Sequence, residues 1–184
     1  TASDVSVSLL DGIISIQNGS GFYLSNEAGT AGRISGQLNT QIASASFGGT
    51  FAVEFNNTGE DVNETIQIGT SVSTLVVPAA DELRIVGEGA TLTTNGLTIA
   101  ANFEFTQGSG QINGVDQSYI VVSADHVFAN IGDDLLTVGS PDQNEAYGTL
   151  VATGNGLAGE LTVSNFTVNL PTLAISTESL NFAI

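Results

Sequence analysis

The stretch from Ala90 to Phe105, ATLTTNGLTIAANFEF, places Asn95-Gly96 between two runs in which apolar and polar side chains alternate. Asn and Gly tolerate the positive φ that a two-residue type I′ turn requires at both central positions. Asn95-Gly96 therefore predicts a tight β-hairpin in which Leu92 faces Ile99. Continued without interruption, this register also sets Val86 opposite Phe105, with one apolar face buried and one polar face in solvent.

Similar signals elsewhere in the chain predict more hairpins. Further Asn-Gly pairs stand between apolar runs at Asn18-Gly19, Asn113-Gly114 and Asn155-Gly156. The segment Phe47–Phe55 has the same alternation as Leu97–Phe105, so we expect it to be the inner strand of a similar hairpin. The sequence thus predicts an all-β fold of antiparallel hairpins stacked into an extended repeat rod or filament, with a compact β-sandwich as the alternative.

Two pairs of segments suggest an internal repeat. VSVSLLDGIISI (Val5–Ile16) resembles VFANIGDDLLTV (Val127–Val138) at a spacing of 122, and GRISGQL (Gly32–Leu38) resembles NGLAGEL (Asn155–Leu161) at a spacing of 123. Matched blocks in the same order at nearly equal spacing are typical of repeat arrays. We expect residues 1–122 to be one full β-repeat and residues 123–184 the first half of a second, continuous with it in one folded unit.

The segments FNNTGEDVNETI (Phe55–Ile66) and LTIAANFEF (Leu97–Phe105) carry a family resemblance. Together with the repeated blocks, they make the chain similar to tandem β-repeats in very large secreted proteins of marine bacteria, including planctomycetes. The resemblance implies surface, adhesin or matrix material, and it supplies no catalytic residues.

The charge of the chain narrows its possible partners. There are 19 acidic residues against two basic ones, Arg33 and Arg84, which gives a formal net charge of −17. Such a chain repels phosphate backbones and anionic lipids, so we expect no nucleic-acid binding. No apolar run approaches the roughly 20 residues that span a bilayer, so we expect no membrane insertion. An acidic shell suits an extracellular or cell-surface location rich in cations.

Catalytic signals are weak. The one histidine, His126, lies in the apolar run VVSADHVFANI beside Asp125, which we expect on the opposite strand face, and its counterpart in the repeat is Asp4. The sequence holds no GxSxG elbow, HExxH helix or P-loop, and Cys and Trp are absent. We expect a structural role for His126 and no enzymatic activity.

Calcium is the ligand that the residue types favour most. NNTGEDVNE (residues 56–64) and GDDLLTVGSPDQNE (residues 132–145) supply the carboxylate and amide oxygens that calcium prefers, without matching a strict motif. Solvated acidic turns are the alternative. The candidate ligands are Asn57, Glu60, Asp61, Asn63 and Glu64 in the first loop, and Asp133, Asp134, Asp142 and Glu145 in the second.

The strand edges suggest self-association. Expected strands such as TQIASASF (Thr40–Phe47) and YIVVSADHVFANI (Tyr119–Ile131) carry no Lys, Arg or Pro, although soluble β-proteins commonly guard exposed edges with charges or Pro. We expect edges to be covered by the next module or subunit through strand addition, with Thr1–Leu10 and Thr172–Ile184 as connecting strands. The function expected is a structural extracellular module that forms or extends a fibre, matrix or adhesin stalk. The alternatives are a calcium-dependent binding module, lectin-like or ice-adhesin-like, and an S-layer lattice protein.

Overall fold

A computed structural model describes residues 1–9, 12–94, 96–112, 114–131, 136–153, 155–164, 166–170, 173–177 and 180–183. Their strands pair antiparallel throughout, which confirms the predicted all-β fold. None of the described residues belongs to a helix that could cross a membrane. The strands are β1 (Ala2–Leu9), β2 (Ile14–Asn26), β3 (Gly29–Thr40), β4 (Ala45–Gly48), β5 (Phe51–Asn56), β6 (Val62–Ile68), β7 (Ser71–Val77), β8 (Ala80–Thr94), β9 (Leu97–Ile112), β10 (Val115–Ile131), β11 (Leu136–Gly139), β12 (Ala146–Thr153), β13 (Gly156–Val163), β14 (Phe166–Leu170), β15 (Leu173–Thr177) and β16 (Leu180–Ala183).

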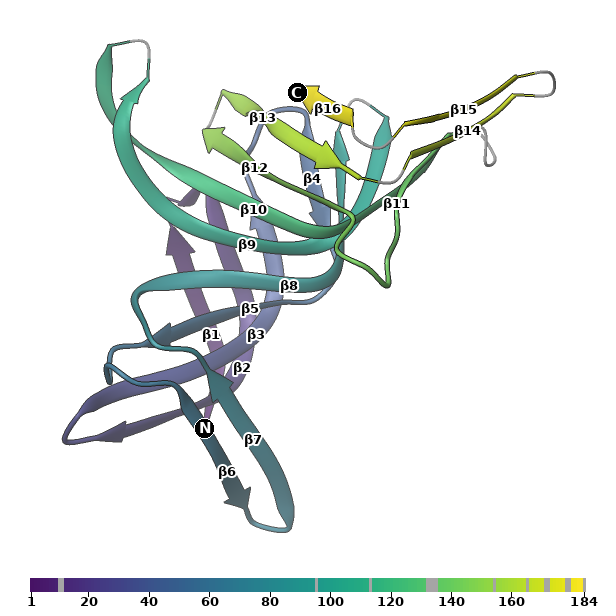
Figure 1. The fold of residues 1–184 in the computed structure, drawn as a ribbon. Helices are drawn as coiled ribbons and strands as arrows, with labels where there is room; N and C mark the ends of the chain where they lie inside the picture. Colours follow the sequence, from purple (N-terminus) through teal and green to yellow (C-terminus); the bar gives the residue numbers. More distant parts are fainter. Residues whose placement is uncertain are drawn as a thin grey trace.

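One large sheet contains most of the strands. Its main path runs β1-β2-β3-β5-β8-β9-β10-β11-β14-β15, with β4 branching from β8 and the series β12-β13-β16 branching from β10. The hairpin β6–β7 forms a separate two-stranded sheet. Figure 1 shows β8, β9 and β10 as long curved ribbons across the middle of the molecule, with β6–β7 projecting at one end and β14–β15 at the other.

Two of the four Asn-Gly pairs, Asn95-Gly96 and Asn113-Gly114, lie between hairpin strands as predicted, separating β8 from β9 and β9 from β10. Asn155-Gly156 lies at the β12–β13 hairpin but one residue late, because Gly156 is the first residue of β13 and pairs with Thr153. Asn18-Gly19 does not form a turn, because it lies inside the continuous strand β2. There Asn18 has φ 52° and forms a bulge, so the left-handed conformation that the pair permits is used to kink a strand.

Left-handed residues recur within the strands and at their ends: Asp4, Asn18, Gly49, Gly89, His126 and Gly139. The three that are not glycine, Asp4, Asn18 and His126, have φ between 49° and 55°, and Asp, Asn and His are the types that most often adopt this region. The bulge at Gly89 shifts the register, so Phe105 pairs with Ile85 and not with Val86 as predicted. Leu92 still pairs with Ile99, on the turn side of the bulge.

The prediction for Phe47–Phe55 is wrong in topology. The segment breaks at Gly49, and its two halves, β4 and β5, both pair with β8 on either side of the bulge at Gly89. The predicted apolar face survives this break, because Phe51 and Val53 are buried and the ring centroid of Phe47 lies 4.9 Å from that of Phe105.

The main core lies between the halves of these bent strands. Aromatic rings occupy its centre: Phe47 and Phe103 pack edge to face at 5.3 Å, and Phe51 and Phe105 at 5.9 Å. Burial of apolar area at roughly 25 cal/mol per Å² is the main stabilising term for such a fold. A smaller cluster of Ala31, Val62, Leu75 and Val77 attaches β6–β7 to the end of the β2–β3 hairpin.

The pairing registers of two distant hairpins agree. In β1–β2, Val7 pairs with Ile16 and Leu9 with Ile14. In β10–β11, Ala129 pairs with Val138 and Ile131 with Leu136. Adding 122 to each residue number of the first hairpin gives the second. The same offset relates Asp4 to His126, and both residues have a positive φ.

The second matched block is displaced from the position that the sequence suggested. Ala2 pairs with Gly21, and Ala124 pairs with Gly148, so the offset in the second strand is 127. Because of this, Gly32–Ile34 corresponds in its pairing to Gly159–Leu161, not to Asn155 and its neighbours. The extra residues lie between β11 and β12, which together occupy the place that the single strand β2 has in the first hairpin.

Candidate functional site

The first predicted calcium loop follows β5 and leads into β6. Asn57 and Asp61 already hold the loop in shape, because Asn57 Oδ1 accepts a hydrogen bond from Thr30 N at 2.6 Å and Asp61 Oδ1 accepts one from Ala79 N at 2.8 Å. Glu60 contributes its main-chain carbonyl, which accepts from the buried Asn56 side chain at 2.8 Å. Residues 58–64 line one hollow together with Leu24, Asn26 and Ala28.

Asn63 and Glu64 lie at the start of β6, and both are exposed. Adjacent residues of a strand point to opposite faces, so the structure does not aim both at one ion. Within the described residues, no group of three or more His, Cys, Asp or Glu side chains is placed to hold a metal. Calcium binding by this loop stays a prediction.

The second predicted calcium loop is described in part. Asp133 and Asp134 lie outside the described residues, whereas Asp142 is exposed in the turn between β11 and β12. Glu145 is half-buried, and its main chain bonds to both Gln143 and Ser164. These main-chain hydrogen bonds hold the loop between β11 and β12, the two strands that together take the place of β2.

A polar cluster surrounds Asn102 in the middle of β9. Its Oδ1 accepts from Gly89 N at 3.0 Å, and its Nδ2 donates to Asp125 Oδ1 at 2.8 Å. Gly89 and His126 are the bulges of the two strands that flank β9. One amide side chain thus connects a bulge on each side of its own strand.

His126 belongs to this cluster. Its bulge turns the side chains of Asp125 and His126 toward each other, and they hydrogen bond. The expectation that Asp125 lies on the opposite face is therefore wrong, because the period of two is broken at φ 49°. His126 N donates to Asn144 Oδ1 at 3.2 Å, which fixes the loop before β12 to the bulge.

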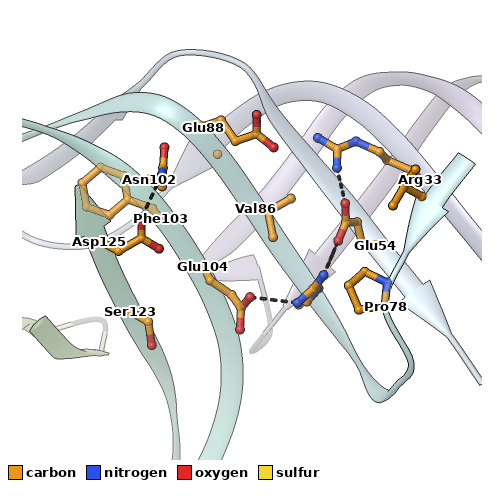
Figure 2. A pocket seen from close by; sticks show the side chains of 13 residues that line it. Arg33, Glu54, Pro78, Val86, Glu88, Asn102, Phe103, Glu104, Ser123 and Asp125 are labelled. Carbon is orange, nitrogen blue, oxygen red and sulfur yellow. Dashed lines mark hydrogen bonds and ion pairs between the residues drawn. The ribbon is translucent and has the colours of Figure 1, made fainter. Parts of the chain in front are cut away.

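A charge ladder runs across four neighbouring strands, and Figure 2 shows it in the same hollow as Asn102 and Asp125. Glu54 of β5 is 2% exposed and binds Arg33 of β3 on one side and Arg84 of β8 on the other, the latter with Nη2 to Oε2 at 2.7 Å. Arg84 Nη1 continues to Glu104 of β9 at 3.0 Å.

Sequence reasoning missed this ladder. Its signal was present, since Arg33 and Arg84 are the only cationic residues beside 19 acidic ones. Both are used to hold Glu54, so the ladder fixes strand order and leaves the surface acidic. A buried charge that loses its partners is strongly destabilising, so any register that separates Glu54 from both arginines is disfavoured.

The edge of the large sheet at β1 is open in the described part of the chain. β1 pairs with β2 and has no second strand partner in the described part of the chain. Its apolar residues Ala2, Val5 and Val7 are only half-buried. The corresponding residues of β10, which has strands on both sides, are nearly inaccessible: Ala124 is 6% exposed, Val127 1% and Ala129 5%.

The Asn102 cluster and the charge ladder thus hold neighbouring strands and bulges together. The open edge of β1 presents backbone N–H and C=O groups to another strand. Comparisons with protein-family models, with curated proteins and with solved structures find no match.

Proposed function

We propose that the chain is a structural module of an extracellular fibre, matrix or adhesin stalk, extended by β-strand pairing between successive repeats. One observation carries this proposal: the hairpin β10–β11 has the register of β1–β2 at an offset of 122, and β9 pairs along β10. The end of one repeat and the start of the next therefore share one ladder of backbone hydrogen bonds.

The joint between the repeats is long. β9 and β10 pair from Ile112 and Val115 through to Ala100 and Phe128, with one bulge. A continuous ladder of this kind resists bending and sliding more than a flexible linker does, because each repeat buries its apolar face against its neighbour. The long shared ladder supports a rod over a string of independent domains.

Three further features support a non-enzymatic extracellular role. The hydrogen bonds of His126 run to Asp125, Asn102 and Asn144, all of which shape a bulge. The net charge of −17 would keep neighbouring rods apart in low salt and permit cation bridging where divalent ions are abundant. The apolar core needs no disulfide, so the absence of Cys is compatible with export.

The test is to lengthen the protein. Residues 1–122 are repeated two, three or four times before residues 123–184, and the particles are measured by negative-stain electron microscopy at seawater ionic strength, with and without EDTA. We expect straight rods that lengthen by one constant step per repeat and persist in EDTA. A flexible string of separate beads would contradict the proposal and favour an array of binding modules.

A further inference from the structure

The strands β1 and β10 occupy equivalent places but have different neighbours. Each pairs on its inner side with the same register at an offset of 122, and each carries a left-handed residue at the bulge, Asp4 or His126. On its outer side β10 pairs with β9, whereas β1 has no partner among the described residues.

We infer that the outer edge of β1 is the docking site for the β9 strand of a preceding copy of the same repeat. The inference rests on the proposed function, since it names the partner and the register of the joint. The β9–β10 pairing within this chain is the template: what covers β10 would cover β1 in the same way.

The template fixes the register of the proposed joint. Phe128 pairs with Ala100, and Asp125 with Asn102. Subtracting 122 places Ser6 opposite Ala100 of the preceding repeat and Ser3 opposite Asn102. The sequence at the joint fits a continuous strand, because Thr1 then follows Val122 where Ser123 stands in β10.

The side chains of β1 suit this neighbour. Ala2, Val5 and Val7 are half-buried, whereas Ala124, Val127 and Ala129 at the equivalent places of β10, which pairs with β9, are nearly inaccessible. A β9 strand beside β1 would complete the burial of its apolar side chains. The side-chain amide of Asn102, which donates to Asp125 and contacts His126, would meet the carboxylate of Asp4. Asp is an acceptor, so the amide keeps a partner in the new setting.

The edge has few guards beyond its bulge at Asp4. β1 contains no Lys, Arg or Pro, and Asp4 is its single charged residue. Soluble β-proteins commonly protect a free edge with charge or Pro. A strand that is paired in the working assembly needs no such protection.

The experiment uses a tandem protein, residues 1–122 followed directly by residues 1–184, with a cysteine at Ala100 of the first copy and at Ser6 of the second. The chain has no native Cys, so any disulfide reports this pair alone. We expect nearly complete cross-linking, because the Cα atoms of directly paired antiparallel residues lie within the separation that a disulfide spans. The matched control moves the second cysteine to Ser8, two residues out of register, and should cross-link at least about tenfold more slowly.

Hydrogen exchange gives a second readout on the protein without cysteines. The amides of β1 in the second copy should exchange as slowly as those of β10, and more slowly than those of β1 in the 184-residue chain. Equal exchange of β1 in the two proteins, or equal cross-linking at Ser6 and Ser8, would overturn the inference. So would a tandem protein that fails to fold, since the joint is inferred to be a continuous strand.

Another copy of β1 could also occupy the edge. If the 184-residue chain with Ser6→Cys alone dimerised and cross-linked as readily as the tandem protein, β1 would pair with itself and the inference would be wrong. Specific cross-linking of Ala100 to Ser6, combined with beaded particles in the electron micrographs of the lengthened protein, would support this joint and reject the proposed rod. Straight rods without that cross-link would support the rod and reject this joint.

Discussion

The hairpins β1–β2 and β10–β11 show how one pattern behaves in two surroundings. They share a register at an offset of 122 and a left-handed residue at the bulge. Their side chains differ: Val7 stands where Ala129 does, and Asp4 where His126 does. The pairing is therefore set by the bulge and the alternation, and the identity of each apolar side chain matters less.

The surroundings decide how deeply these side chains are buried. Val127 is 1% exposed in a strand that has partners on both sides, whereas Val5 at the equivalent place is half-buried at the sheet edge. The same residue type at the same register position thus contributes differently to stability. Mutating equivalent positions in parallel separates the contribution of the repeat itself from that of its neighbour.

The largest expected loss of stability concerns the charge ladder, which residues 123–184 do not reproduce. By the pairing registers, Glu160 stands at the place of Arg33 and Ala183 at that of Glu54. Arg84→Ala leaves the buried Glu54 carboxylate with Arg33 alone, so we expect a loss of about 3–4 kcal/mol of unfolding free energy, toward the lower end of the cost of breaking a buried pair. Urea denaturation of the variant measures this loss.

Two variants control for this result. Replacing both partners, Arg84→Met with Glu54→Leu, should recover most of the stability, since no unpaired buried charge remains. Glu160→Gln, at the exposed equivalent of Arg33, should change it by less than about 0.5 kcal/mol. A loss as large in the double variant as in Arg84→Ala would show that packing, and not charge pairing, is responsible.

The next effect compares two glycines that lie against equivalent valines. A Cβ on Gly139 would stand 2.0 Å from the carbonyl oxygen of Val127, at φ +65°, whereas one on Gly19 would stand 2.9 Å from that of Val5. We expect Gly139→Ala to cost about 3 kcal/mol, because strain and collision add, and Gly19→Ala about 1 kcal/mol. Thermal unfolding of the two variants checks the order, and equal losses would mean that the contact with the valine carbonyl does not set the cost.

A smaller effect distinguishes the two valines. Val127→Ala should cost about 2 kcal/mol, as expected for a fully buried aliphatic side chain, and Val5→Ala about 1 kcal/mol. In the tandem protein, Val5→Ala in the second copy should rise to the cost of Val127→Ala. An unchanged cost there, by urea denaturation, would mean that nothing new covers β1.

The sequence pattern was sufficient for local structure and failed where distant strands meet. The alternation from Leu97 to Phe105 and the Asn-Gly turns correctly predicted strands and hairpins. The bulge at Gly89 could not be predicted, because a single inserted residue shifts the register without changing composition. Pairing of Arg33 with Glu54 depends on β3 lying beside β5, which local periodicity does not encode.

The smallest expected change in stability tests the calcium hypothesis in the loop after β5, which has no described counterpart in residues 123–184. If the loop binds calcium at the millimolar level common for extracellular modules, about 10 mM calcium should add about 1 kcal/mol to the unfolding free energy. Glu60→Gln with Glu64→Gln should abolish this gain, and it leaves the bond from Asn56 to the Glu60 carbonyl in place.

Glu160→Gln with Glu27→Gln removes the same charge from exposed positions outside the loop and should keep the gain from calcium. Thermal unfolding with calcium or with magnesium separates binding in the loop from general screening of the acidic surface, because magnesium demands a stricter geometry at the same charge. An equal gain from both ions in every variant would mean that the residues from Asn57 to Glu64 form a solvated acidic turn.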